Sequence, residues 1–144
     1  MSLTGAYDHD NVFAKILRGE LPCVKVMEDD RVLAFMDVFP QSEGHVLVIS
    51  KVSRARNLLE AEPEVLQDLI LAAQTIARVQ PEALGCEGVS LMQFNGSAGG
   101  QTVFHLHLHV IPRWAGRPLG GHGQGGMADT DELKATAARI SAAL

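Results

Sequence analysis

Apolar residues in the first third of the chain follow a helical period and then strand periods. Residues 11–18 carry apolar side chains three and four positions apart, which predicts a short helix with Asp10 as its cap. Three runs rich in β-branched residues follow, and a turn-forming Glu-Asp-Asp separates the first two. We therefore expect strands over 23–27, 31–38 and 45–50.

The second part of the chain alternates between the same two periods. Apolar residues keep helical spacing from Pro63, a favourable first residue of a helix, to Pro81, which is expected to end it. Residues 89–94 and 102–111 then predict two further strands, joined by a glycine-rich loop.

A second glycine-rich stretch and a last helix close the chain, and Asp129 and Glu132 have the spacing of a capping box for that helix. The order of elements predicts an α+β domain in which helices cover one face of a five-stranded antiparallel sheet. No composition shift divides the sequence. We expect a single domain over 1–144, with its core at about 11–113 and the glycine-rich loop and helix at 114–144.

Composition and charge exclude several classes of partner. With a net charge of -5 and a pI near 5.6, no general affinity for nucleic acid or for an anionic membrane is expected. The apolar runs are too short to span a bilayer, and the first ten residues lack the regions of a signal peptide. Cys23 and Cys86 each stand alone, as a reducing compartment permits, and we expect a soluble cytoplasmic protein.

Three of the six histidines, His105, His107 and His109, occupy alternate positions of the last predicted strand. Side chains at i, i+2 and i+4 share one face of a strand, so the apolar residues between the imidazoles point towards the core. One interpretation is a polar sheet face. Another is a metal site, but the outer Cα atoms lie about 13 Å apart, whereas nitrogens bind zinc at about 2.0 to 2.1 Å. No Cys, Asp or Glu is spaced to complete such a ligand set.

The third interpretation is catalysis at phosphorus. A neutral imidazole can attack phosphorus, and a second imidazole that titrates near neutrality can protonate the leaving group. The preceding loop contains Gly96, Gly99 and Gly100, which let backbone N–H groups approach an anionic oxygen. Because these signals are adjacent in one segment, phosphorus chemistry is the leading hypothesis.

The run His-Leu-His-Leu-His-Val-Ile resembles the His-φ-His-φ-His-φ-φ signature of the histidine triad (HIT) family, and the residues around it look like the family's surrounding block. The resemblance covers Asn11 to Arg113 and is strongest for the branch that includes the Hint-type nucleoside phosphoramidases. It implies the HIT-like fold, a five-stranded antiparallel sheet with helices. It also implies a homodimer that pairs last-helix and strand surfaces into a ten-stranded sheet.

The resemblance further implies a hydrolase or transferase that cleaves the α-phosphate bond of purine nucleoside phosphoramidates and releases AMP or GMP, without a cofactor. His107 would form a nucleotidyl-histidine intermediate, and His109 would help the leaving group depart. His105 would support the tautomer of His107, His45 is a further active-site histidine, and Gln101 flanks the phosphate. An asymmetric dinucleoside polyphosphate hydrolase and a low-turnover nucleotide-binding regulatory protein are the alternatives.

The nucleotide site is implied in the same way. Apolar residues would form the base pocket, Asp37 would accept hydrogen bonds from the ribose hydroxyls, and the glycine-rich loop would hold the phosphate. The expected nucleotide-binding residues are Val12, Phe13, Ile16, Phe35, Asp37, Val38, Asn95, Gly100, Gln101, Thr102, His107 and His109. Phe94 stands where Hint-type proteins have a nucleotide-contacting asparagine, with Asn95 one position later.

Some bacterial members of the family hold a structural zinc with two cysteines, a further histidine and the first triad histidine. The corresponding positions here are Asn11, Ala14 and Ser53, so three of the four ligands are missing and no metal site is expected. In relatives the C-terminal segment reaches towards the partner's site. Here that segment contains Trp114 and His122, and we expect His122 in an exposed loop.

Overall fold

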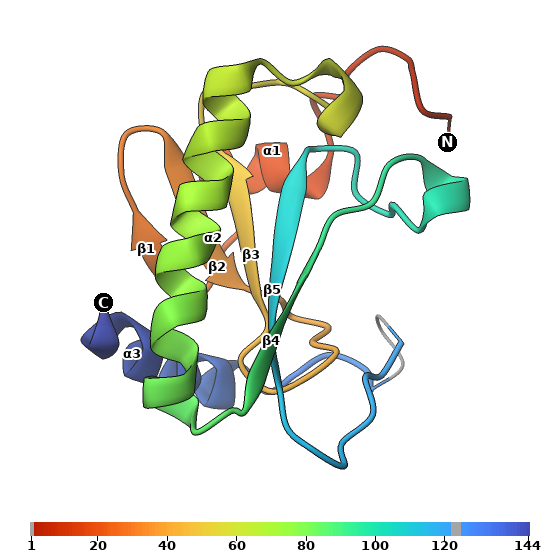
Figure 1. Ribbon diagram of the computed structural model, residues 1–144. Helices are drawn as coiled ribbons and strands as arrows, with labels where there is room; N and C mark the ends of the chain where they lie inside the picture. The colour runs from red at the N-terminus through yellow and green to blue at the C-terminus, as the bar shows by residue number, and fades with distance from the viewer. Residues whose placement is uncertain (1, 122–124) are drawn as a thin grey trace.

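The computed structural model describes residues 2–121 and 125–144, so the expectation for His122 lies outside the described residues. The sheet has five strands, and Figure 1 shows a long helix across its front and a short helix behind it. In chain order the elements are α1 Val12–Leu17, β1 Lys25–Glu28, β2 Val32–Met36, β3 Val46–Ser50, the 3-10 turn η1 Leu58–Glu60, α2 Pro63–Leu84, β4 Gly88–Met92, the 3-10 turn η2 Ser97–Gly99, β5 His107–Arg113 and α3 Thr130–Ala143.

Every strand runs antiparallel to its neighbours, in the order β1-β2-β3-β5-β4, which confirms the expected sheet. β5 lies between β3 and β4, and β4 forms one edge. The register pairs Leu47 with His109 and Ile49 with His107. Directly paired residues point to the same side of a sheet, so the two histidines share a face with these two apolar residues.

The two faces of the sheet carry separate apolar clusters. α2 and α3 pack on the face that presents Val46, Val48 and Val110. On the opposite face, Phe13 of α1 packs against Leu33, Phe35, Leu47 and Ile49. The prediction that all helices cover one face is therefore wrong for α1. Its apolar stripe packs on the face that also carries His107 and His109.

Two helix ends differ from the prediction. Asn11 caps α1 instead of Asp10, because its Oδ1 accepts the Ala14 N–H at 2.9 Å while the Asp10 N–H donates to Asp8.

α2 continues through Pro81 to Leu84 and ends at Gly85, which adopts the left-handed conformation with φ 73°. A proline within the last turn removes only one backbone hydrogen bond, and its restricted φ is compatible with a helix, so the helix is not broken there. The cap of α3 is as predicted, since the Asp129 carboxylate accepts the Glu132 N–H at 3.1 Å. None of the described helices is long and apolar enough to cross a membrane.

The last strand also begins later than predicted, at His107. The final pair between β3 and β5 joins Ile49 to His107, so the residues before His107 have no sheet partner. There the Leu106 N–H donates instead to the carbonyl oxygen of Ala55, at 3.0 Å. His105 therefore precedes the strand that carries the other two triad histidines. Alternation of polar and apolar residues does not show at which residue a strand stops pairing with the adjacent strand.

Candidate active site

A pocket of about 690 Å³ lies on the α1 face of the sheet, between α1, the end of β2 and β5. Most of its wall is apolar. The polar residues that line it are Asp37, Thr102, His107 and His109, so hydrogen-bonding groups are few. This combination of an apolar cavity with a few polar side chains is typical of a small-molecule site.

Nine of the predicted nucleotide-binding residues line the pocket, namely Val12, Phe13, Ile16, Phe35, Asp37, Val38, Thr102, His107 and His109. Asn95, Gly100 and Gln101 do not. Further lining residues that were not predicted are Leu21, Pro22, Cys23, Met36, Phe39, Leu47, Val103 and Met127. Three of these, Met36, Phe39 and Val103, are sequence neighbours of predicted ones, whereas residues 21–23 lie between α1 and β1 and Met127 belongs to the C-terminal segment.

His107 is buried, and its ring lies beside those of Phe13 and His109, with centroids 4.9 Å away in each case. Its Nδ1 atom is 2.6 Å from the carbonyl oxygen of His105. A carbonyl oxygen can only accept, so Nδ1 carries the proton, and in the neutral ring the lone pair is on Nε2. The partner of Nδ1 is thus the backbone of His105 and not its ring.

The His105 ring is buried outside the pocket. Its Nε2 donates to the carbonyl oxygen of Ser50 at 3.2 Å, and its Nδ1 lies 2.6 Å from the hydroxyl of Tyr7. Burial lowers the pKa of His105 to about 4, so the ring is neutral near pH 7 and its Nδ1 accepts the Tyr7 O–H. Sequence reasoning missed Tyr7, because a single aromatic residue in a polar N-terminal segment has no periodic signal.

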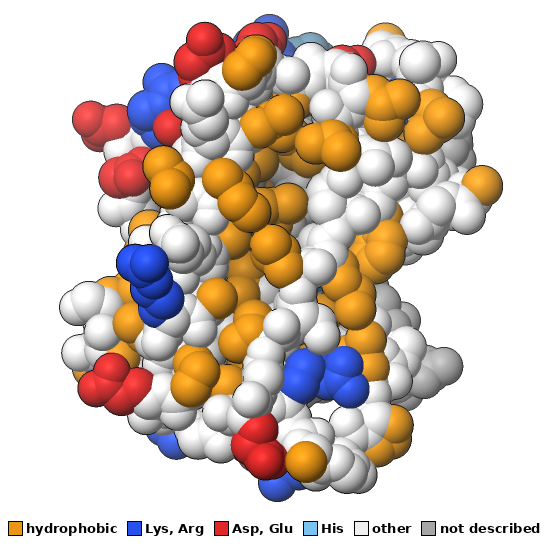
Figure 2. Space-filling view, in the orientation of Figure 1, with side chains coloured by type: hydrophobic (Ala, Val, Ile, Leu, Met, Phe, Trp, Pro, Cys, Tyr) orange, Lys and Arg blue, Asp and Glu red, His pale blue; other side chains and the backbone are white. Residues whose placement is uncertain are grey.

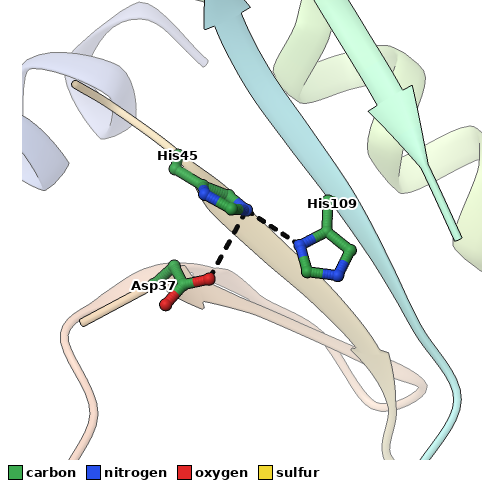
Figure 3. A group of neighbouring side chains, drawn as sticks. All are labelled: Asp37, His45 and His109. Atoms are coloured by element: carbon green, nitrogen blue, oxygen red, sulfur yellow. Dashed lines mark hydrogen bonds and ion pairs between the residues drawn. The ribbon is translucent and has the colours of Figure 1, made fainter. Parts of the chain in front are cut away.

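Three buried side chains meet where β2, β3 and β5 come together (Figure 3). The Nε2 atom of His45 lies 2.9 Å from Nδ1 of His109 and 3.5 Å from Oδ2 of Asp37. The Gln41 N–H donates to His45 Nδ1 at 3.1 Å, so the proton of the neutral His45 ring is on Nε2. The His45 Nε2–H therefore donates to Nδ1 of His109. Because that nitrogen accepts, the single proton of a neutral His109 ring is on Nε2.

The ligand atoms of Asp37, His45 and His109 all lie within 4.8 Å of one another, close enough for a shared metal ion. No carboxylate is spaced in the sequence to complete a ligand set with the triad, but the fold brings Asp37 beside His45 and His109. The hydrogen bonds nevertheless do not suit a metal. Coordination through His45 Nε2 would move its proton to Nδ1, where it would face the Gln41 N–H.

The positions that would correspond to zinc ligands in some bacterial histidine triad proteins do not suit a metal either. Asn11 uses its Oδ1 to cap α1, Ala14 offers no ligand atom, and the Ser53 hydroxyl accepts the Ala55 N–H at 3.0 Å. Both ring nitrogens of His105 have hydrogen-bond partners. Neither set of residues fits a bound metal ion.

Gln101 closes the glycine-rich loop and does not line the pocket. Its Oε1 accepts the Gly96 N–H at 2.9 Å, and its Nε2 donates to the carbonyl oxygens of Arg56 at 2.7 Å and Val103 at 3.0 Å. Because the side chain is buried with these partners, its position is that of a loop anchor.

The backbone of the same loop differs from the expected anion cradle. The N–H groups of Gly99, Gly100 and Gln101 donate to carbonyl oxygens within the loop, at 3.0 to 3.1 Å. These three amides are therefore not directed at the pocket. Thr102, which follows them, does line it.

Phe94, rather than Asn95, is the neighbour of the triad. The Phe94 and His109 rings meet edge to face with centroids 5.4 Å apart. Asn95 accepts the Leu58 N–H at 2.9 Å and forms two hydrogen bonds with the Gln93 amide, at 2.8 and 3.0 Å. Its side chain is therefore held by Leu58 of η1 and by Gln93, the residue after β4, and does not line the pocket.

The C-terminal segment returns to the pocket of its own chain. Gln41 and Gly120 are joined by two hydrogen bonds, and the Ala128 N–H donates to the Val38 carbonyl oxygen at 2.9 Å. Met127 consequently reaches the pocket rim, where it is 70% exposed. Met127 is far in sequence from the other lining residues, so local spacing in the sequence could not predict that it lines the pocket.

Comparison with known protein sequences identifies related enzymes. Adenylylsulfatase HINT3 of Arabidopsis thaliana is 39% identical over 120 residues, which are 79% of this chain and 60% of that protein. The chain thus spans less than two thirds of that relative. Adenosine 5'-monophosphoramidase hnt1 of Schizosaccharomyces pombe is 37% identical over 102 residues, 71% of this chain and 73% of that protein.

Solved structures match the whole fold. A Hit-like protein of Bartonella henselae, described as involved in cell-cycle regulation, has a TM-score of 0.89 and 47% identity, covering 96% of this chain and 100% of that one. A zinc-bound histidine triad protein of Mycobacterium smegmatis has a TM-score of 0.81 and 33% identity, covering 93% and 92%. A sequence profile of the HIT domain matches residues 18–116, and the chain belongs to the histidine triad (HIT) family.

Proposed function

We propose that the protein cleaves the α-phosphate bond of purine nucleoside phosphoramidates through a nucleotidyl-histidine intermediate. The observation that carries this proposal is the hydrogen bond from His107 Nδ1 to the His105 carbonyl oxygen, beside a largely apolar pocket. It leaves the lone pair of Nε2 for attack on phosphorus. The names of two relatives, an adenylylsulfatase and an adenosine monophosphoramidase, support AMP conjugates as the class of substrate.

The pocket supports one orientation of the nucleotide. Its apolar end, with Phe13 and Ile16, suits a purine base, and its volume of about 690 Å³ suits a nucleoside. Asp37, at the end of β2, would accept hydrogen bonds from the ribose hydroxyls. The α-phosphate would then lie against His107 and His109, at the end of the pocket that β5 forms.

In the proposed reaction, Nε2 of His107 forms a bond to phosphorus while the phosphorus–nitrogen bond breaks. The departing nitrogen keeps the electron pair of that bond and takes a proton from Nε2 of His109, which enters the step as the imidazolium and leaves it as the neutral ring. His45 lies 2.9 Å from Nδ1 of His109, and the Asp37 carboxylate beside His45 favours the positive charge of that imidazolium. Water then attacks the intermediate, returns a proton to His109, and releases the nucleoside monophosphate and the His107 ring.

The charge of the pocket favours phosphoramidates over dinucleoside polyphosphates. No Lys or Arg is among the described residues that line it. A phosphoramidate carries a single negative charge at the reacting phosphorus, which two imidazoles and a hydroxyl can bind. A polyphosphate chain or a sulfate leaving group adds negative charge for which this lining has no cation.

A substrate comparison tests the proposal. Adenosine 5'-phosphoramidate, adenylylsulfate and diadenosine tetraphosphate would be supplied at equal concentration, and AMP release would be followed. We expect many turnovers on the phosphoramidate, with kcat/KM at least tenfold above that for the other two substrates. Tight AMP binding without turnover of any of the three would contradict the proposal and favour a regulatory nucleotide-binding protein.

We also propose a homodimer, on a surface that differs in part from the expected one. Figure 2 shows hydrophobic side chains gathered along the face that carries α2 and β4. The apolar residues that line a groove on this face are Leu58, Leu66, Leu69, Ile70, Leu106 and Leu108, and Leu91 of β4 is 49% exposed. β4 is also an edge strand, whose unpaired backbone groups could continue the sheet into a second copy.

The last helix does not contribute to this surface. α3 buries Leu133, Ala137 and Ile140 against the core of its own chain. The surface that supports dimerisation is therefore α2 with β4.

A further inference from the structure

The N-terminal segment, residues 2–7, packs against residues that adjoin the histidine triad in the fold. The Leu3 carbonyl oxygen accepts a hydrogen bond from the Asn57 side chain at 2.8 Å, and the Leu3 side chain packs against Gly96. At the end of this segment, the Tyr7 hydroxyl lies 2.6 Å from Nδ1 of His105, a residue 98 positions later. The segment is thus attached to the first histidine of the triad.

The hydrogen bond from Tyr7 completes the environment of the His105 ring. The opposite nitrogen, Nε2, donates to the Ser50 carbonyl oxygen at 3.2 Å. The rings of Tyr7 and Phe13 also meet the His105 ring edge to face, with centroids 5.8 and 6.3 Å away. Two hydrogen bonds on opposite nitrogens allow one tautomer and one orientation of a neutral ring.

The backbone of the same residue holds the proposed nucleophile, because the His105 carbonyl oxygen accepts the Nδ1–H of His107 at 2.6 Å. We propose that Tyr7 is a positioning residue, whose hydroxyl fixes His105 so that its carbonyl oxygen keeps His107 in the tautomer that attacks phosphorus. The effect on rate rests on the proposed function, whereas the effect on the two tautomers does not.

The physical reason is the cost of an unsatisfied buried acceptor. Without the hydroxyl, Nδ1 of His105 would be buried without its donor, and the ring could regain a partner only by rotating or by exchanging its proton. Either change would disturb the backbone of His105, just before β5. The carbonyl oxygen of this residue accepts the Nδ1–H of His107. Tyr7 does not line the pocket, so nucleotide binding should be little affected.

The test is Tyr7→Phe, which removes only the hydroxyl. Long-range nitrogen–proton NMR spectra would identify the tautomers of His105 and His107 in the unliganded protein, and rapid quenching would give the rate of nucleotidylation. We expect His107 to lose its single Nδ1–H tautomer, and the nucleotidylation rate to fall about tenfold. KM for adenosine 5'-phosphoramidate should change by less than about twofold, because the pocket is intact.

His9→Ala is the matched control. The His9 ring contacts the Tyr7 ring edge to face at 5.2 Å, so this variant weakens the packing of the segment but keeps the hydroxyl. We expect wild-type tautomers and a rate within twofold of the wild type. A rate loss in His9→Ala equal to that in Tyr7→Phe would overturn the proposal, because the segment would then act through packing alone.

Two further outcomes would also overturn it. One is a folded Tyr7→Phe protein with both tautomers unchanged and the nucleotidylation rate within twofold of the wild type. The other is a wild-type spectrum with the His105 proton on Nδ1, which can be read even if the variant does not fold. If the wild type shows no nucleotidylation at all, the proposed function fails, and the NMR spectra still decide the role of Tyr7.

Discussion

The Nε2 atom of His45 lies 2.9 Å from the Nδ1 atom of His109, although the two residues are 64 positions apart in the sequence. This hydrogen bond leaves the proton of the neutral His109 ring on Nε2. The same His45 atom is 3.5 Å from the Asp37 carboxylate. His45 and Asp37 thus lie on the Nδ1 side of His109, and its Nε2 is the atom that exchanges a proton in the proposed reaction.

The first prediction concerns the leaving group. His109→Ala should lower kcat by about a hundredfold or more for an AMP alkylamidate, because the departing amine needs a proton. AMP p-nitrophenyl ester, whose leaving group departs as an anion, should lose much less. Steady-state kinetics on both substrates measures the difference. Equal losses on the two would argue against His109 as the proton donor.

His45→Phe extends this prediction. The variant removes the donor to His109 Nδ1 but leaves His109 in the site. We expect the same dependence on the leaving group, with a smaller loss than in His109→Ala. A loss that is independent of the leaving group would indicate that His45 has only a packing role.

The second prediction concerns the ribose. Asp37→Asn should lower kcat/KM for adenosine 5'-phosphoramidate about tenfold or more, because a hydrogen bond to a charged group contributes about 1.5 to 3 kcal/mol. The 2',3'-dideoxy substrate should lose little from the same substitution, since it has no hydroxyls to donate. Asp30→Asn, in the exposed turn before β2, is the control. Equal losses on both substrates would mean that Asp37 acts only through His45.

The third prediction concerns pH and stability. Burial lowers the pKa of His105 to about 4, whereas in the unfolded chain it has its ordinary value of 6.5. As the pH falls below 6.5, the unfolded chain takes up a proton that the folded chain does not. The free energy of unfolding should therefore decrease between pH 6.5 and about pH 4, by about 3 kcal/mol for this residue at 1.36 kcal/mol per pH unit.

Urea unfolding of the wild type and of His105→Asn over this range measures that contribution. The wild type should lose more stability than the variant, whose residue 105 cannot be protonated. Parallel curves for the two proteins would show that folding does not lower the pKa of His105.

The fourth prediction concerns assembly. Ile70 is 47% exposed on α2, at the apolar surface beside β4. Ile70→Glu should convert the dimer to a monomer, because a charge in an apolar interface loses its hydration. Ala138→Glu, on the exposed side of α3, should leave the dimer intact. Light scattering on size-separated protein gives the masses. A dimeric Ile70→Glu variant together with a monomeric Ala138→Glu variant would assign the interface to α3.

The patterns that the sequence predicts best are those set by local spacing. The five strands, α2 and the Asp129 cap follow from apolar period and helix-end residues, and the alternation around His107 places its neighbours in the core. The start of β5 and the continuation of α2 past Pro81 could not be predicted. The first depends on where β3 ends, and the second on how little a proline costs in a final turn.

The site is predictable in its residue types but not in its contacts. His107, His109 and the apolar residues implied for the base line one pocket, whereas the His105 ring lies outside it. Tyr7 and Met127 come from the two ends of the chain, and Asp37 reaches His45 only through the pairing of β2 with β3. Gln101 and Asn95 show the converse, since both bind neighbouring backbone groups outside the pocket. Such contacts depend on tertiary structure, which spacing in the sequence does not encode.

In the proposed reaction, His107 carries the nucleotide between the two steps. Adenosine 5'-phosphoramidate would be mixed with the protein, quenched within milliseconds in alkali, and the intact mass and the fragment masses recorded. We predict a protein heavier by one adenylyl group, with the group on His107 and no adduct in His107→Ala, whose turnover should fall by orders of magnitude. An adduct on another residue, or undiminished AMP release by His107→Ala, would contradict the account.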